Sequence, residues 1–116
     1  MAIEQSHSGT NSSWGTEYSL TNASTTLANN TTSGVYQLFL DLSALASGDT
    51  YTIRIYEKTR ATSTRRVIVE HVVTGAQATP IWAFPAMTLM HGWDMSVICT
   101  AGVNTRAIEW SIRRVF

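Results

Sequence analysis

The stretch VYQLFLDL, residues 35–42, places large apolar side chains at positions 36, 38, 40 and 42, all on one face. The stretch TYTIRIYEK, residues 50–58, repeats this pattern with Tyr51, Ile53 and Ile55. A period of two residues is typical of a strand with one buried face. These two segments therefore predict an antiparallel sheet whose inner face covers an apolar core.

Further segments with strand character flank this pair, and Pro80 and Pro85 predict an edge or bent strand between residues 80 and 90. The total of about eight strands predicts an all-β fold, a single antiparallel β-sandwich of the jelly-roll kind over residues 16–116. The other expected strands are 18–20, 25–28, 65–73, 93–101 and 106–116. The positions expected to be buried are Leu38, Leu40, Ile53, Ile55, Val67, Val69, Val97, Ile108, Trp110 and Ile112.

The composition supports a β-rich domain and excludes several classes of protein. Of 116 residues, 17 are Thr and 12 are Ser, whereas charged residues make up only 14%, against the roughly 25% of ordinary soluble domains. The net charge of zero argues against a nucleic-acid-binding protein. A single cysteine, Cys99, excludes an internal disulfide, and no apolar run is long enough to cross a membrane. The first residues lack the basic and apolar regions of a secretory signal, so synthesis in a cytoplasm is expected.

Residues 1–15 are small and polar, and they show no periodicity. Such a segment buries too little apolar surface to offset the entropy lost on ordering, so we expect a flexible N-terminal arm. Trp14 is the exception in this arm. It either docks the arm on its own domain or contacts a partner.

The charges are divided along the chain. No Lys or Arg precedes Arg54, so the chain before it carries a charge of −4, from Glu4, Glu17, Asp41 and Asp49, and the remainder carries +4. The division fits two solvated faces of one sandwich. It also fits complementarity between neighbouring copies in an assembly, and on that interpretation we expect an oligomer, a homotrimer.

No constellation typical of catalysis is present in the sequence. The tetrapeptide from His91 to Asp94 is the segment that most resembles a reactive site, but Gly and Asp also suit a turn between strands. Cys99 shares a face with Val97, which favours a buried thiol. Clusters with the spacing of zinc or calcium ligands are missing. We therefore expect a protein that is not an enzyme and that needs no cofactor or metal.

Two features could form a surface for a partner. Trp82 lies between two prolines and fits either a core position or a stacking platform for a sugar, a role that Trp93 or Tyr56 could also take. A basic cluster brackets the expected hairpin tip, where arginine side chains suit recognition of carboxylates. Its members are Lys58, Arg60, Arg65 and Arg66. With Trp14 and Trp82 they are the candidate interface residues.

From Glu17 to Phe116 the order of motifs resembles small structural proteins encoded by tailed bacteriophages. The segments that carry the resemblance are EYSLTN (17–22), GVYQL (34–38), DLSAL (41–45), GD (48–49), YEK (56–58), RRV (65–67), PIW (80–82), HGWD (91–94) and IEWSIR (108–113). The resemblance implies a virion component, and a capsid decoration protein is similar in size and in its β-rich fold. Such proteins are often trimers that grip capsid subunits with an N-terminal arm.

The resemblance thus leads us to expect a protein on the capsid surface whose partners are the major capsid protein and further copies of itself. Nucleic acid and membranes are not expected partners. The alternative is a carbohydrate- or receptor-binding β-sandwich module of a phage head or tail fibre.

Overall fold

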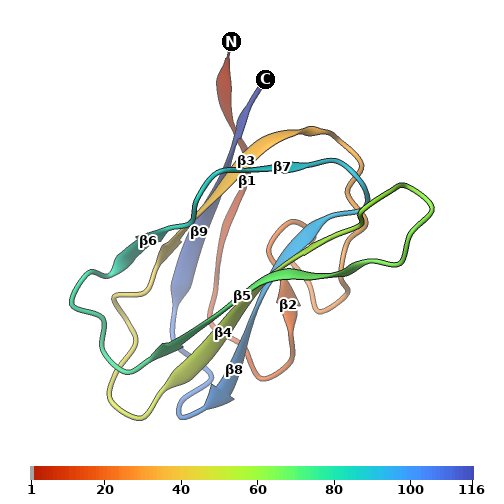
Figure 1. Ribbon diagram of the computed structural model, residues 1–116. Coiled ribbons are helices and arrows are strands. Elements are labelled where there is room, and N and C mark those ends of the chain that lie inside the picture. The colour runs from red at the N-terminus through yellow and green to blue at the C-terminus, as the bar shows by residue number, and fades with distance from the viewer. Residues whose placement is uncertain (1) are drawn as a thin grey trace.

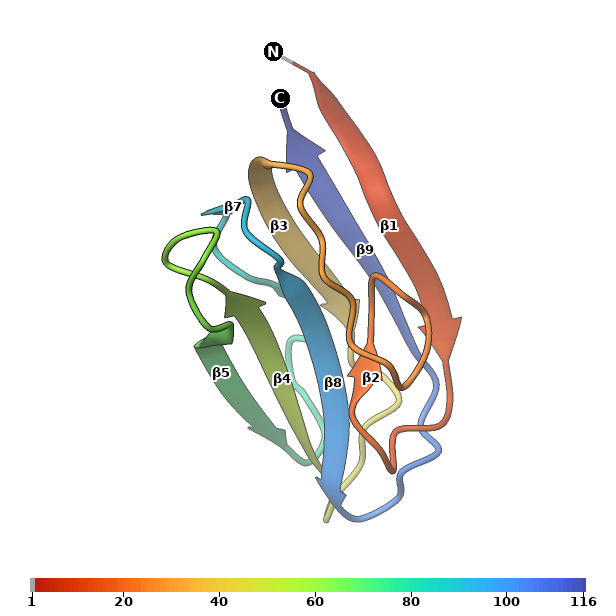
Figure 2. The ribbon, with the colours of Figure 1, turned by 90° about the vertical axis from the view of Figure 1, so that its right-hand side faces the viewer.

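The computed structural model describes residues 2–116, which form two antiparallel sheets packed face to face (Figures 1 and 2). Within this part of the chain all regular secondary structure is β, and no helix that could cross a membrane is present. The strands are β1 (Ile3–Asn11), β2 (Tyr18–Ser19), β3 (Gly34–Asp41), β4 (Thr50–Glu57), β5 (Arg66–Thr74), β6 (Ile81–Ala83), β7 (Met87–Leu89), β8 (Asp94–Ala101) and β9 (Ile108–Val115).

The strand order is that of a jelly roll. One sheet has the order β1-β9-β3-β6, with β7 also paired to β3, and the other has the order β2-β8-β4-β5. β6 pairs with one end of β3 and β7 with the other, so these two short strands share one position and are separated at Pro85. The nine strands therefore fill eight positions, and the prediction of a β-sandwich is confirmed.

The alternating segments supply the core, because their inner faces meet between the two sheets. Eight of the ten positions expected to be buried are at most 4% exposed, whereas Val69 is half-buried. The prediction for Val67 is wrong, since this side chain is 42% exposed. The β4–β5 register shifts between Ile55 and Tyr56, and this bulge pairs Val67 with outward-facing Tyr56.

The flexible arm is the main correction to the sequence-based prediction. Residues of the expected arm form β1, which pairs with β9 from Ile3↔Val115 to Asn11↔Ile108 (Figure 2). The segment has few apolar side chains to bury, but its backbone hydrogen bonds to β9 stabilise it as a strand. Its polar side chains are tolerated because one face of an antiparallel sheet can be exposed to water. The sandwich therefore begins at β1 rather than at residue 16.

The segment between β2 and β3 contains no strand at residues 25–28, where one was expected. It is held instead by buried Asp94, whose carboxylate accepts hydrogen bonds from the Thr21 hydroxyl at 2.7 Å and the Ala28 N–H at 2.8 Å. A side chain that satisfies backbone donors can fix a loop without a ladder of strand pairs.

Candidate functional site

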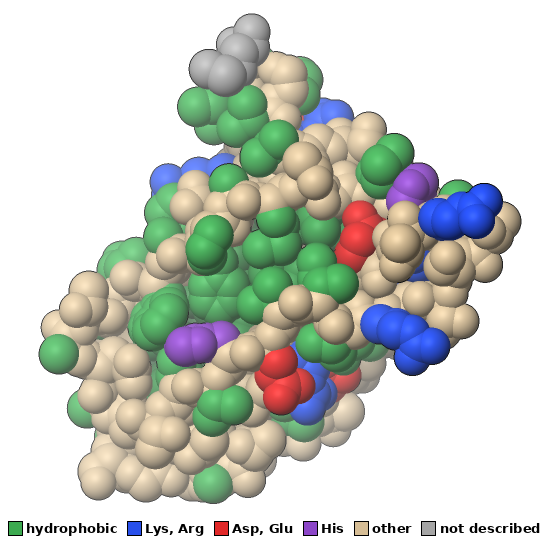
Figure 3. Space-filling view, in the orientation of Figure 1, with side chains coloured by type: hydrophobic (Ala, Val, Ile, Leu, Met, Phe, Trp, Pro, Cys, Tyr) green, Lys and Arg blue, Asp and Glu red, His purple; other side chains and the backbone are tan. Residues whose placement is uncertain are grey.

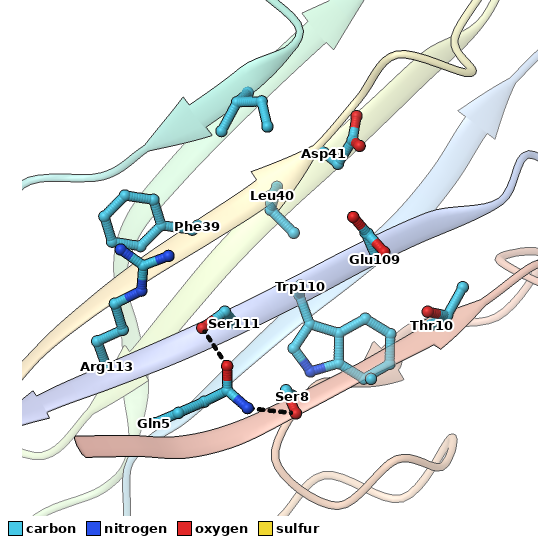
Figure 4. Close-up of a pocket in the computed structure, with 12 residues that line it drawn as sticks. Gln5, Ser8, Thr10, Phe39, Leu40, Asp41, Glu109, Trp110, Ser111 and Arg113 are labelled. Atoms are coloured by element: carbon cyan, nitrogen blue, oxygen red, sulfur yellow. Dashed lines mark hydrogen bonds between the residues drawn. The ribbon is translucent and has the colours of Figure 1, made fainter.

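The outer face of the five-stranded sheet carries a shallow hollow of about 410 Å³, which we call the sheet groove (Figure 4). The strand register builds it from successive rows of outward side chains. One row runs across the sheet from Thr10 through Glu109 and Asp41 to Ile81. The groove is lined by Gln5, Ser8, Gly9, Thr10, Phe39, Leu40, Asp41, Ile81, Glu109, Trp110, Ser111 and Arg113.

Two carboxylates lie side by side in this groove. Asp41 on β3 is the direct cross-strand neighbour of Glu109 on β9 (Figure 4), a position that brings Cβ atoms to about 4.5–5.5 Å of each other. Asp41 accepts a hydrogen bond from the Ser43 N–H at 3.0 Å, and hydrogen bonding by Ser43 lowers the pKa of Asp41. Within residues 2–116 neither carboxylate forms an ion pair. The like-charged pair costs stability and leaves strong acceptors open to solvent.

Arg113 supplies the opposite charge at the other end of the groove. Its guanidinium lies over the Phe39 ring, 3.8 Å from the centroid (Figure 4), and it donates no hydrogen bond to the described part of the chain. This cation–π contact restrains the guanidinium and leaves its N–H groups available. Between the two ends the Gln5 amide donates to the Ser8 hydroxyl at 3.0 Å and accepts from that of Ser111 at 3.2 Å.

The basic cluster is only partly available for a partner. Arg65 donates hydrogen bonds to the carbonyls of Ala28 and Gly92 and lies over the Tyr56 ring, so it fastens the hairpin to the loops beside it. Arg60 and Arg66 are exposed, and Lys58 is half-buried. The hairpin end therefore presents two exposed guanidinium groups.

The two tryptophans proposed as interface residues take structural positions. Trp14 is fully buried, and its indole N–H donates to the Arg106 carbonyl at 2.7 Å, so it docks the β1–β2 connection on its own domain. Trp82 is half-buried and packs on His71 of the opposite sheet, with 4.3 Å between ring centroids. Both side chains serve the sandwich itself.

Trp82, His71 and buried Phe84 form a cluster that we call the aromatic clasp. It connects β5 and β6, which are edge strands of the two sheets and do not pair with each other. Figure 3 shows hydrophobic side chains gathered there, with a histidine at their border. Half-buried Val69 and Met87 also pack on the core. This side is closed by side chains rather than by strand pairing.

The tetrapeptide from His91 to Asp94 is structural. Trp93 is fully buried and Gly92 has a positive φ of 67°, while Asp94 bonds to the β2–β3 connection as described above. The Glu57 carboxylate accepts the backbone N–H groups of Met90 and His91. Trp93 therefore offers no platform for a sugar, and the hydroxyl of Tyr56, the other proposed platform, is bonded to Glu17.

The residues of the sheet groove were not assigned to a binding site from the sequence. Asp41, Glu109 and Arg113 all occupy outward positions of alternating strands, and that signal was visible in the sequence. What could not be read was the pairing of β3 with β9, which brings residues 41 and 109 together across 68 positions of chain.

We compared the chain with protein-family models, curated proteins and solved structures, and none of the three comparisons gave a match.

Proposed function

We propose that the protein is a non-enzymatic virion component of a tailed bacteriophage, a capsid decoration protein that binds and stabilises the lattice of the major capsid protein. The resemblance of its motifs to phage structural proteins supports the class. The jelly roll supports it at the level of fold, because viral capsid proteins use this architecture, as do lectins.

The surface that we propose for capsid binding is the unpaired edge of β5. This strand of 9 residues pairs with β4 on one side, and no other strand of residues 2–116 pairs with it. Val67, Ile68 and Val72 are 42%, 50% and 51% exposed. An edge strand with exposed β-branched side chains is a template to which a strand of another protein can add.

The other edges are protected against such pairing. β2 has 2 residues, and β6 and β7 have 3 each, with Pro80 and Pro85 beside them. β1 is long but carries mostly polar side chains. The Glu70 carboxylate of β5 is paired with Arg54 at 2.9 Å, so it adds no unpaired negative charge to this strand. The differences in length and in side-chain polarity between β5 and the other edge strands favour β5 as the strand that meets a capsid subunit.

The first experiment measures whether the protein is part of the virion. We expect quantitative mass spectrometry of purified virions to find it at a copy number in simple proportion to the major capsid protein. Its absence from virions, or a few copies confined to tails, contradicts the capsid proposal.

The second experiment tests the edge itself by adding lysines that protect it. The double variant Ile68→Lys/Val72→Lys is expected to bind empty heads at least tenfold more weakly, about 1.4 kcal/mol, with little change in thermal unfolding. The matched control is Val103→Lys, at a loop position that is 45% exposed. Equal binding by the double variant and the control contradicts a role for β5.

A further inference from the structure

We propose that the sheet groove is a binding site for a neutral oligosaccharide. The groove lies on the outer face of the five-stranded sheet, whereas β5 belongs to the other sheet. The site therefore does not depend on the capsid assignment, and it adds a second binding surface to the molecule.

The hydrogen-bonding groups of the groove point to the class of ligand. Glu109 accepts no side-chain or backbone hydrogen bond within residues 2–116, and the only bond that Asp41 accepts there is the one from Ser43. Arg113 offers N–H donors at the opposite end. Hydroxyl groups both donate and accept, so a polyol can satisfy carboxylates and guanidinium with one kind of group.

The charged residues of the groove disfavour a ligand that carries charges of only one sign. A polycation that is held by Asp41 and Glu109 and spans the groove meets Arg113 at the other end, and a polyanion held by Arg113 meets the two carboxylates. A neutral ligand experiences neither conflict and still gains charge-assisted hydrogen bonds, which are roughly twice as strong as bonds between neutral groups. The mixed groove therefore fits an uncharged saccharide better than it fits a peptide of uniform charge.

The dimensions indicate more than one sugar unit. Glu109 and Arg113 lie four residues apart on β9, which is about 13 Å along a strand. The volume of about 410 Å³ lies at the lower end of the roughly 300–1,000 Å³ of small-molecule sites. Ile81 is 57% exposed at the border and offers an apolar contact for the C–H face of a sugar ring. A chain of two or three sugars can therefore reach both charged ends.

The orientation of the guanidinium is part of the site. The guanidinium carbon of Arg113 lies 3.8 Å from the centroid of the Phe39 ring, and this contact limits the freedom that the planar fork loses when a ligand binds. We expect Arg113→Lys to weaken saccharide binding although it keeps the charge, because an ammonium group has no flat face to stack and no fork to present.

The experiment begins with an array of neutral oligosaccharides that includes glucans, galactans and chitin fragments. We expect binding to at least one series, and we expect calorimetry with the trisaccharide of that series to give a dissociation constant. The variant Asp41→Asn/Glu109→Gln keeps the shapes of both side chains and removes the like-charge repulsion, so it is expected to fold. Its affinity for the trisaccharide is expected to fall at least tenfold.

The matched control is Glu70→Gln, which removes an exposed carboxylate from the outer face of the other sheet. It is expected to bind the trisaccharide like the original protein. A tetra-arginine peptide, a tetra-glutamate peptide and calcium chloride are titrated as rival ligands. Tighter binding of any of these, no binding on the array, or unchanged affinity of the double variant overturns the saccharide proposal. The groove variants are expected to bind empty heads like the original protein, and the β5 double variant is expected to bind the trisaccharide like the original protein. These two measurements separate a failure of the saccharide proposal from a failure of the capsid proposal.

Discussion

Asp49 is 1% exposed and lies immediately before β4, where its carboxylate is bonded from three sides. Arg106 Nε donates to it at 2.7 Å, and the backbone N–H groups of Val103 and Ala46 each donate at 2.9 Å. These hydrogen bonds, with that of Arg106 the largest contribution, lower the pKa of Asp49 from 3.8 to about 2. One residue thus ties the start of β4 to the β8–β9 turn.

The lowered pKa predicts how acid affects stability. The ionised form is favoured in the folded state, so this contribution to stability is complete above pH about 4 and is lost as the pH falls towards about 2. We expect the free energy of unfolding of Asp49→Asn to depend less on pH across this interval than that of the original protein. Urea unfolding at pH 2, 3, 4 and 6 measures the difference, and parallel curves contradict the prediction.

Gly9 on β1 is the cross-strand partner of Trp110 and lies against its ring. A Cβ atom at this position lies 2.7 Å from Trp110 Cζ2. The indole is 4% exposed, and its N–H donates to the Leu20 carbonyl at 2.9 Å, so it has little room to move. We expect Gly9→Ala to lower the free energy of unfolding by roughly 1–3 kcal/mol. Ser8→Ala on the outer face is the control, and equal stability of the two variants contradicts this packing.

β1 is an edge strand of the five-stranded sheet, and it covers one side of β9. Its register with β9 runs over nearly the full length of both strands, with one irregularity between Gln5 and His7. His7 also contacts the core, since its ring packs edge-on against Trp93 at 6.0 Å, and burial lowers the pKa of this histidine. A mobile arm contributes none of these contacts.

The strand assignment predicts the effect of removing residues 1–11. Deletion leaves β9 as a bare edge and uncovers Trp110, so we expect the melting temperature to fall by about 10 °C or more, equivalent to roughly 2 kcal/mol. Differential scanning calorimetry measures the change. Gln5→Thr/Ser8→Thr, which keeps the strand, is expected to melt near the original temperature. An unchanged melting temperature after deletion supports a mobile arm instead.

The negative first part of the chain and the positive remainder form ion pairs with each other within one copy of the protein. Three of the four acids that precede Arg54 pair with arginines from the other part of the chain. These pairs are Glu17 with Arg54 at 3.4 Å, Asp49 with Arg106 at 2.7 Å and Glu4 with Arg114 at 3.3 Å. Burial opposes ionisation of Glu17, but hydrogen bonds from Ser96 and Tyr56 and the charge of Arg54 lower its pKa. The division therefore gives no argument for neighbouring copies.

The proposed homotrimer rests instead on the resemblance to phage decoration proteins, because the free edge of β5 is assigned to the capsid subunit. We expect sedimentation velocity at tens of micromolar to show a trimer both for the original protein and for Ile68→Lys/Val72→Lys. A monomer in the original protein contradicts a trimer assembled in solution.

The fold class and most of the core were predictable from the pattern of residues along the chain. A side-chain period of two is a local property, so Leu38, Ile53 and Ile112 could be assigned to inner faces without knowing which strands pair. The turns and the two prolines likewise marked where strands end. These signals were enough to predict a jelly-roll sandwich.

Features that depend on contacts between segments distant in the chain became visible only in the folded molecule. Residues 3–11 carry no apolar pattern, and they form a strand because β9 supplies the backbone hydrogen bonds. Val67 faces outward because the β4–β5 pairing contains a bulge. The sheet groove exists because the β3–β9 register sets Asp41 beside Glu109. Register is a property of two strands at once, and a single strand's sequence does not contain it.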